Sequence, residues 1–569
     1  MSSITSKITL VVAAVLVTFI IIIARLLYLQ MYCQAYFAER STKNFIRYET
    51  HHTPRGDIYD IHGHLLATNK PITSLMWQGT GNKGLNAFQK SALEELTAIV
   101  EKDFLSGQLY EKIVYAERRN QKVVLESPLD FSALSKIAEK FSQHSNIVID
   151  TTFKRFYPYN HYASHVIGYV GNIRVFTQGQ SGLEKQFDVD LSGKSTEMCH
   201  VVNSAGRRLS QKEIEKGSSG SDLYTTIDIM LQQLCEKSFP DYYTGSFILF
   251  NPVDGAIKAL VSRPSYDPNI FLHPISSDTW RALQEGNPFL NRAFDASYPS
   301  GSIFKLITIS AALEHEIIAS DMTWNCTGYT IFGNRKYWCG RKSGHGEITV
   351  EQAVATSCNT LFFEIGKKID IDVLADYARK FGLGEKTHCI LPEKSGLVPN
   401  REWKFTTKGE RWWPGETLSV TIGQSFLLVT PIQIVRMIAS IFTGYLVNPR
   451  LLENEPIITT ALDIRPETRS FLKKSMKMVV RYGTGRSMRK IKDIKIYGKT
   501  STAQTSDLGK RILDPKYLEH GWLVIYFQYK DNDPLVLGVM VERVGSAHVA
   551  TTIAKDFLAE YKNYMDRVE

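Results

Sequence analysis

The sequence lacks a regular cysteine framework, a long basic run, internal repeats and low-complexity tracts. Its seven cysteines follow no dense, regular spacing, which excludes a small disulfide scaffold. Its net charge of +9 is spread over 569 residues without a long basic run, so we expect no nucleic-acid partner. Internal repeats and low-complexity tracts are absent. Apolar residues make up 43% and charged residues 22%, a balance that predicts a globular protein of more than one domain.

Long apolar runs are also scarce, and only one is long enough to cross a membrane. Residues 8–24 carry no charge, and residues 26–29 extend the apolar character. A membrane-spanning helix needs about 20 such residues. A cleaved signal peptide would need small residues after the run, and bulky Tyr32 argues against Cys33 as a lipid-attachment site. We expect an uncleaved single-pass anchor in the cytoplasmic (inner) membrane, with the rest of the chain periplasmic.

The remaining chain divides at a Gly/Ser-rich linker, Glu215 to Asp222. Before it, short alternating runs and amphipathic helices are mixed. After it, a strand pair with a turn sequence comes first, helical patterns follow, and a second strand pair comes last; these strands are expected at residues 246–250, 256–261, 522–529 and 535–541. Strands at both ends of a helical region predict one sheet flanked by helices.

Three short motifs in this second region combine hydroxyl, amide and amine groups. Ser302-Ile-Phe-Lys305 begins an apolar run typical of a buried helix, where positions i and i+3 share a face. A desolvated lysine beside a serine can accept its proton and make it a nucleophile. Ser357-Cys-Asn359 offers a hydroxyl and an amide. Lys499-Thr-Ser-Thr502 ends an alternating run that predicts a strand, and it suits a ligand carboxylate. Each motif alone is weak evidence.

Taken in order, the three motifs resemble those of the penicilloyl-serine transferases. Further segments resemble the pedestal and transpeptidase domains of class B penicillin-binding proteins: Thr53 to Asp60, Arg155 to Pro158, His165 to Gly171, Gly182 to Lys185, Pro264 to Asn269, Thr421 to Gln424, Thr430 to Gln433 and Gly483 to Gly485. Residues 275–277, 344–346 and 412–416 are most similar to penicillin-binding protein 2, the elongation group, with the septal group second.

The resemblance implies an α+β/α/β fold in three parts. Residues 1–30 would form the cytoplasmic tip and anchor, and residues 31–215 an elongated mixed α+β pedestal with a head insertion at about 71–150. Residues 216–569 would form a transpeptidase domain with a mainly antiparallel sheet between helices. The implied activity is D,D-transpeptidation of peptidoglycan stem peptides on nascent glycan strands, inhibited by β-lactams. A membrane glycosyltransferase and a rod-complex scaffold are the implied partners, and no organic cofactor is implied.

The resemblance also assigns roles to the motif residues. Ser302 would attack the D-Ala-D-Ala carbonyl, Lys305 would be its base, and Ser357 would relay the proton to the leaving amine. Asn359 would position the peptide. The terminal carboxylate would lie against Lys499, Thr500 and Thr502, and backbone N–H groups of Ser302 and Thr502 would form the oxyanion hole.

Ser501 stands where the family pattern has glycine. Glycine there allows the strand to approach the ligand closely, so an added side chain could narrow the slot. A β-lactamase shares the three motifs but needs neither a pedestal nor an anchor. A non-catalytic scaffold is the other alternative, and Ser501 is its only support. Acylation by a labelled penicillin separates the scaffold from the enzyme.

A metal site is expected between the first two motifs. Cys326, Cys339, His345 and Cys358 form the pattern Cys-x12-Cys-x5-His-x12-Cys. Three thiolates and an imidazole suit tetrahedral zinc, and four protein ligands imply a structural ion. The segments around Cys326 and His345 also resemble a region that binds metal in some relatives. The alternative is a Cys326–Cys339 disulfide with Cys358 as a buried thiol.

Overall fold

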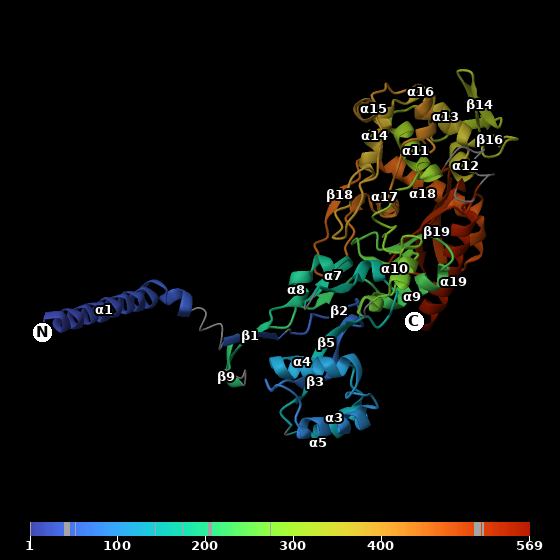
Figure 1. Ribbon diagram of the computed structural model, residues 1–569. Coiled ribbons are helices and arrows are strands. Elements are labelled where there is room, and N and C mark those ends of the chain that lie inside the picture. Colours follow the sequence, from blue (N-terminus) through green and yellow to red (C-terminus); the bar gives the residue numbers. More distant parts are fainter. Residues whose placement is uncertain are drawn as a thin grey trace. The chain divides into compact units, whose positions relative to one another are not determined.

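The computed structural model describes residues 2–38, 46–51, 53–142, 144–173, 176–202, 208–505, 514 and 517–568. The chain forms two compact units. The first comprises Met1–Arg55, Asn69–Lys154 and Ser192–Gly220, and the second comprises Gly56–Thr68, Arg155–Leu191 and Ser221–Glu569. Figure 1 traces the chain from the N-terminus to the C-terminus.

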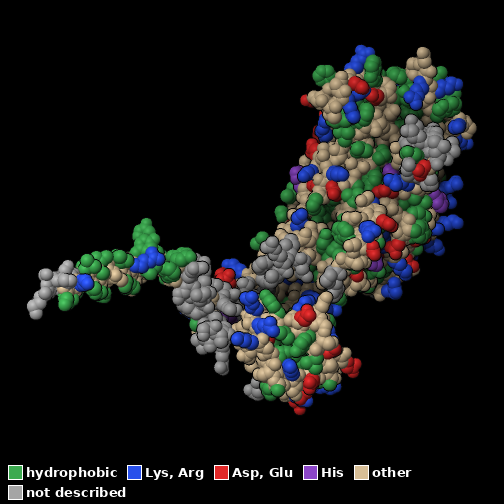
Figure 2. All heavy atoms as spheres, in the orientation of Figure 1, with side chains coloured by type: hydrophobic (Ala, Val, Ile, Leu, Met, Phe, Trp, Pro, Cys, Tyr) green, Lys and Arg blue, Asp and Glu red, His purple; other side chains and the backbone are tan. Residues whose placement is uncertain are grey.

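The first unit begins with the expected apolar helix. Helix α1 (Ser2–Leu27) continues into a π-helical turn, Tyr28–Tyr32, and residues Lys7–Tyr32 have a mean hydropathy of 2.9. None of the apolar window is buried against the rest of the protein, and Figure 2 shows hydrophobic side chains along the helix. By length and composition it could cross a membrane.

The rest of this unit contains two sheets. One has the order β1-β8-β9 (Ile46–His51, Thr196–Val202, Arg208–Glu215). In the other, β3 (Leu65–Gln78) pairs with β4 (Lys122–Glu126) and β5 (Ile147–Phe156). Its apolar face packs on a core that includes Leu93, Phe104 and Ile137, around α3 (Ala87–Val100), α4 (Gly107–Arg119) and α5 (Phe131–Lys140).

The second unit opens with short elements that buried polar contacts hold together. They are β2 (Ile58–Tyr59), α6 (Ser164–Ile167), β6 (Val170–Ile173), β7 (Phe176–Gly179), α7 (Gly182–Gln186), α8 (Asp188–Ser192) and β10 (Leu223–Tyr224). Arg155 Nε lies 2.6 Å from Glu184 Oε1, and both side chains are 1% exposed or less. A buried pair of this kind needs further hydrogen bonds, and Arg155 Nη1 also donates to the Gly56 carbonyl at 2.7 Å. Three of the sequence segments that resemble the pedestal therefore meet here.

A five-stranded antiparallel sheet organises the rest of this unit, in the order β12-β11-β21-β20-β19. Its strands are β11 (Gly245–Phe250), β12 (Ile257–Arg263), β19 (Ile494–Ala503), β20 (His520–Tyr529) and β21 (Leu535–Val541). The four strands expected from the sequence are thus confirmed within a few residues. The third motif lies at the end of the edge strand β19, as expected from the sequence.

Helices cover both faces of the sheet because its central strands carry apolar side chains on both faces. Successive side chains point to opposite faces, so Phe247 and Leu249 pack with α9 (Ile229–Ser238) and α19 (His548–Val568). Ile248 and Phe250 belong to the core of the other face, with α11 (Lys305–Glu314) and α17 (Pro431–Thr443). Figure 1 shows α19 beside this sheet.

Helices, short strands and 3₁₀ turns make up the remaining elements. They are η2 (Pro268–Leu272), α10 (Ser277–Gln284), η3 (Gly301–Ile303), β13 (Thr323–Cys326), β14 (Tyr329–Phe332), β15 (Arg335–Trp338), β16 (Gly346–Thr349), α12 (Val350–Ala355), α13 (Asn359–Lys368), α14 (Ile371–Lys380), α15 (Arg401–Lys408), α16 (Pro414–Val420), β17 (Tyr445–Val447), β18 (Thr459–Ala461), α18 (Pro466–Arg481) and η4 (Arg486–Lys490).

Candidate active site

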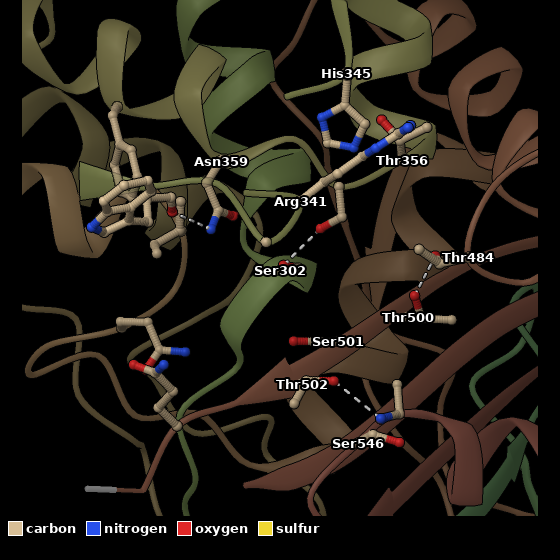
Figure 3. Close-up of a pocket in the computed structure, with 18 of the residues that line it drawn as sticks. Ser302, Arg341, His345, Thr356, Asn359, Thr484, Thr500, Ser501, Thr502 and Ser546 are labelled. Carbon is tan, nitrogen blue, oxygen red and sulfur yellow. Dashed lines mark hydrogen bonds between the residues drawn. The ribbon is translucent and has the colours of Figure 1, made fainter. Parts of the chain in front are cut away.

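A cleft of about 970 Å³ brings the three motifs together. Ser302, Ser357 and Asn359 line it, as do Thr500, Ser501 and Thr502. In Figure 3 the strand residues Thr500 to Thr502 lie on one side of Ser302, and Asn359 lies on the other. Segments some 50 and 200 positions apart in the sequence thereby form one site.

Ser302 lies on a 3₁₀ turn, and Lys305 begins the helix that follows. The turn depends on a close contact with the segment Thr421 to Gln424. The Gly301 N–H donates to the Gly423 carbonyl at 2.9 Å, and a Cβ on Gly423 would lie 2.1 Å from the Gly301 oxygen. Gly423 also has φ +73°, so glycine is required there for two reasons. This contact fixes the position of the Ser302 hydroxyl.

Ser357 connects Ser302 to Lys305. Its Oγ donates to Ser302 Oγ at 2.8 Å, and Lys305 Nζ donates to Ser357 Oγ at 3.1 Å. Ser357 lies between α12 and α13 with φ +56°, a left-handed conformation that costs a serine energy. Lys305 Nζ also donates to the Ser357 carbonyl at 2.9 Å and to Asn359 Oδ1 at 2.6 Å. Ser302 and Lys305 thus face the same site, as expected, and Ser357 connects them by hydrogen bonds.

Both lysines of the site are fully buried. Burial lowers the pKa of Lys305 to about 8, although Cys358 and Cys339 nearby favour its charged form. Burial and then the neighbouring Lys305 lower the pKa of Lys499 well below its usual value. Lys499 Nζ lies 3.5 Å from Ser357 Oγ and donates to the Thr500 carbonyl at 3.0 Å. Lys305 can therefore lose its proton near neutral pH.

Ser501 points its hydroxyl at the Ser302 turn. Its side chain is 2% exposed, and its Oγ has no hydrogen-bond partner among the described residues. A Cβ on Gly301 would lie 2.3 Å from this oxygen, so the hydroxyl fills the space beside that glycine. The serine that stands in place of the usual glycine therefore packs against Gly301.

Some cleft residues were not assigned roles from the sequence. Thr484 hydrogen-bonds through its hydroxyl to Thr500, and Asn359 Nδ2 donates to the Trp338 carbonyl at 3.2 Å. The segment Gly483 to Gly485 was recognised as similar to the family, and its position could have indicated Thr484. Nothing in the sequence indicated Trp338, because its contribution is a backbone carbonyl.

The four residues expected to bind metal also meet. The Sγ atoms of Cys326, Cys339 and Cys358 and one ring nitrogen of His345 all lie within 4.8 Å of one another. The three thiols are buried, and Cys339 Sγ lies 3.6 Å from His345 Nδ1. Every cysteine is a free thiol, so the alternative Cys326–Cys339 disulfide is not formed. A hydrogen bond with Cys358 lowers the pKa of the Cys339 thiol.

Two families of known proteins match this chain. Residues 245–559 match the family described as penicillin binding protein transpeptidase domain, and residues 50–225 match the penicillin-binding protein dimerisation domain. The chain is a class B penicillin-binding protein. More than half of it is covered by the transpeptidase match alone.

The most similar relatives place this penicillin-binding protein in the elongation group. It is 29% identical to the peptidoglycan D,D-transpeptidase MrdA of Acinetobacter baumannii over 96% of this chain and 86% of the relative. It is 30% identical to MrdA of Salmonella typhimurium, over 79% and 76%. This penicillin-binding protein is therefore an elongation-type peptidoglycan D,D-transpeptidase, and the septal alternative is not favoured.

Solved structures agree with this assignment. The chain resembles penicillin-binding protein 2 of Helicobacter pylori in complex with MreC, with TM-score 0.78 and 26% identity over 92% of this chain and 99% of the other. It also resembles a chain from "Structural coordination of polymerization and crosslinking by a peptidoglycan synthase complex", with TM-score 0.76 and 28% identity over 98% of both chains. The expected fold, a dimerisation-type domain followed by a transpeptidase domain, is confirmed.

Proposed function

We propose that Ser302 is the residue that becomes acylated in the transpeptidase reaction, with Lys305 as its base. The contact chain from Ser302 Oγ to Ser357 Oγ to Lys305 Nζ, at 2.8 and 3.1 Å, carries this proposal. A general base must lie within hydrogen-bond reach of its proton, directly or through one group. Ser357 is that group. A neutral Lys305, favoured by burial, then receives the Ser302 proton through it.

The acyl transfer then takes two steps, acylation of Ser302 and transfer of the acyl group to a second amine. The bond from Ser302 Oγ to the D-Ala carbonyl carbon forms while the serine proton passes to Lys305. The carbon–nitrogen bond to the last D-Ala then breaks, and that amine takes the proton back through Ser357. The amine of a second stem peptide then attacks the resulting ester, and the bond from the carbonyl carbon to Ser302 Oγ breaks. The proton lost by that amine passes to Ser302 Oγ and restores the hydroxyl.

Residues around Ser302 position the peptide during these steps. We assign Asn359 to the peptide backbone, because its amide lies on the cleft wall between Lys305 and Trp338. The terminal carboxylate would lie against the hydroxyls of Thr500 and Thr502, with Lys499 buried directly behind them and Ser501 beside them. Backbone N–H groups of Ser302 and Thr502 would hold the oxyanion, which such donors stabilise strongly.

Mass spectrometry of the full chain after benzylpenicillin treatment tests this proposal. We expect one penicilloyl adduct, on Ser302. Lys305→Ala should slow its formation at least about 10²-fold without unfolding the protein, and Lys408→Ala, an exposed lysine outside the cleft, should not. An adduct on another serine, or none at high drug concentration, would refute the assignment.

We also propose a division of the chain and a location for it. Residues 1–30 would anchor it in the inner membrane, 31–215 would form the pedestal with its head insertion, and 216–569 the periplasmic transpeptidase domain. The exposed apolar surface of α1 supports the anchor. A scaffold related to MreC and a membrane glycosyltransferase are the proposed partners, because similar structures were solved with MreC and within a peptidoglycan synthase complex.

Zinc is the ion proposed for the cluster of Cys326, Cys339, His345 and Cys358. Four ligand atoms within 4.8 Å of one another fit a tetrahedral ion with bonds of about 2.0–2.3 Å. Four protein ligands leave no open position, so the ion would be structural. Because Cys358 lies between Ser357 and Asn359, the bound ion would hold that segment from behind.

A further inference from the structure

The charge on the walls of the active-site cleft is of one sign. Four cationic side chains line it, Arg335, Lys336, Arg341 and Arg486, and no Asp or Glu is found among the described residues that line it. The whole chain is nearly balanced, with 67 Lys and Arg against 58 Asp and Glu. The imbalance is therefore a local property of this cleft.

None of the four cations is neutralised by a carboxylate in the described parts of the chain. Lys336 Nζ lies 4.5 Å from the centre of the Tyr329 ring, and the Arg335 guanidinium lies 5.5 Å from that of Tyr337. Arg341 Nε donates to Ser343 Oγ at 3.3 Å. Aromatic rings and a hydroxyl orient these side chains without cancelling their charge. All four side chains are exposed, so their charges remain available to a ligand.

The cations come from separate elements around Ser302. Arg335 and Lys336 lie on β15, and Arg341 lies in the loop that follows it. Arg486 begins η4, two positions after Thr484, which contacts Thr500. Figure 3 shows Arg341 and Thr484 at different edges of the cleft around Ser302. A ligand extending from Ser302 in more than one direction would pass a cation.

We propose that these four residues, the cationic rim, bind carboxylates of the stem peptides other than the terminal one, so that the cleft selects stems with free carboxylates over amidated ones. The inference rests on the proposed function of Ser302. The terminal carboxylate has its own place at Thr500 and Thr502, which leaves the rim for further anionic groups. A cleft with charge of one sign concentrates ligands of the opposite sign, and arginine can pair with carboxylate through two hydrogen bonds.

Competition with a fluorescent penicillin on the full-length protein in detergent tests the rim. Two synthetic stem pentapeptides ending in D-Ala-D-Ala are compared, one with free inner carboxylates and one with these amidated. The peptide with free carboxylates should slow Ser302 acylation by half at a concentration about five- to tenfold lower than the amidated peptide requires. This ratio should fall towards one in Arg335→Gln/Lys336→Gln and with rising salt, because exposed charge pairs are screened. Each result is expressed relative to acylation without peptide.

The control variant is Lys408→Gln/Lys495→Gln, which removes two exposed cations that do not line the cleft. It should keep the wild-type ratio. Donor and acceptor stems are separated by a second measurement, the rate at which free or amidated amine peptides discharge a preformed acyl-enzyme. A preference in that rate alone would assign the rim to the acceptor stem.

Equal effects of the two peptides in both measurements, or inhibition by neither peptide, would overturn the rim proposal. A ratio lost equally in the control variant would overturn it too, because net charge would then be the cause. Failure of wild-type protein to form the Ser302 adduct would instead overturn the proposed function.

Discussion

Burial determines the protonation of Lys305, the base proposed for Ser302. Its pKa is lowered to about 8 because the charged form loses hydration. The neutral form is the one that accepts a proton, so the neutral fraction falls about tenfold for each pH unit below this pKa. We expect the rate of Ser302 acylation by benzylpenicillin to rise about tenfold per unit up to about pH 8 and then to level off.

Stopped-flow measurement of acylation between pH 6 and 9 checks this profile. Thermal unfolding at each pH provides the control for stability. A rate that stays constant across this range, in protein that remains folded, would show that Lys305 does not act as the base.

The Ser501 side chain is also polar and buried near Ser302, but unlike Lys305 it has no proposed role in the reaction. Its buried hydroxyl lacks a hydrogen-bond partner in the described structure, and such a group carries an unrecovered desolvation cost. Removing it relieves that cost, while glycine adds backbone freedom that costs roughly 0.5–1 kcal/mol. We therefore expect Ser501→Gly to fold and to acylate as fast as the wild type or faster.

Acylation kinetics of Ser501→Gly and Ser501→Ala separate the hydroxyl from the Cβ. Ser501→Ala keeps the Cβ and should also retain full activity. If both variants are folded yet acylate much more slowly, the hydroxyl takes part in binding or catalysis.

At the level of residues, motif order was sufficient to identify Ser302, Lys305, Ser357, Asn359 and Lys499 as neighbours, and the structure brings them together. The resemblance implied that Ser357 relays a proton to the leaving amine, but its place between Ser302 and Lys305 could not be predicted, because it depends on the left-handed backbone of Ser357. The cations at Arg335 and Arg486 were also missed. Their charges act together only in the folded protein, where β15 and η4 line the same cleft.

At the level of elements, alternating and continuous apolar runs predicted the strands of the central sheet. The motif from Lys499 to Thr502 was expected to end a strand, and it lies at the end of β19, which pairs with β20 throughout. The apolar alternation itself stops at Gly498. Beyond it Ser501 is buried against the Ser302 turn, a contact that a linear pattern does not record.

The proposed zinc ion would join two short, largely exposed strands to two helices of the hydrophobic core. Cys326 ends β13, His345 precedes β16, and Cys358 links α12 to α13. We expect purified protein to contain about one zinc per chain and Cys339→Ser to contain none. Because Ser357 and Asn359 flank Cys358, metal loss should also slow Ser302 acylation and lower the melting temperature.

Elemental analysis of protein purified without chelator measures the metal, and Cys389→Ser provides the control. Cys389 is buried but lies outside the cluster, so this variant should retain zinc. Metal-free wild-type protein, with unchanged acylation after chelator treatment, would contradict the proposed site.

At the level of the whole molecule, composition predicted several domains and one apolar helix. The two compact units and α1 agree with that expectation. The units were harder to delimit from the sequence because each is built from three separate stretches of the chain. The Arg155–Glu184 pair shows the reason: residues 29 positions apart hold one unit together across intervening loops, and a linear pattern carries no record of such contacts.

The exposed apolar surface of α1 leads to the last prediction, on membrane insertion. Leu16 and Ile20 lie near the middle of the helix, and both are more than half exposed. An aspartate at the centre of a spanning helix costs about 2.5–3.5 kcal/mol, so Leu16→Asp/Ile20→Asp should prevent stable insertion. Alkaline carbonate should then release the variant from isolated membranes, whereas wild type and Leu16→Ala/Ile20→Ala should stay in the pellet. The released protein should still react with penicillin, because the residues proposed for catalysis lie in the second unit. Release of the wild-type chain under the same treatment would show that α1 does not anchor it.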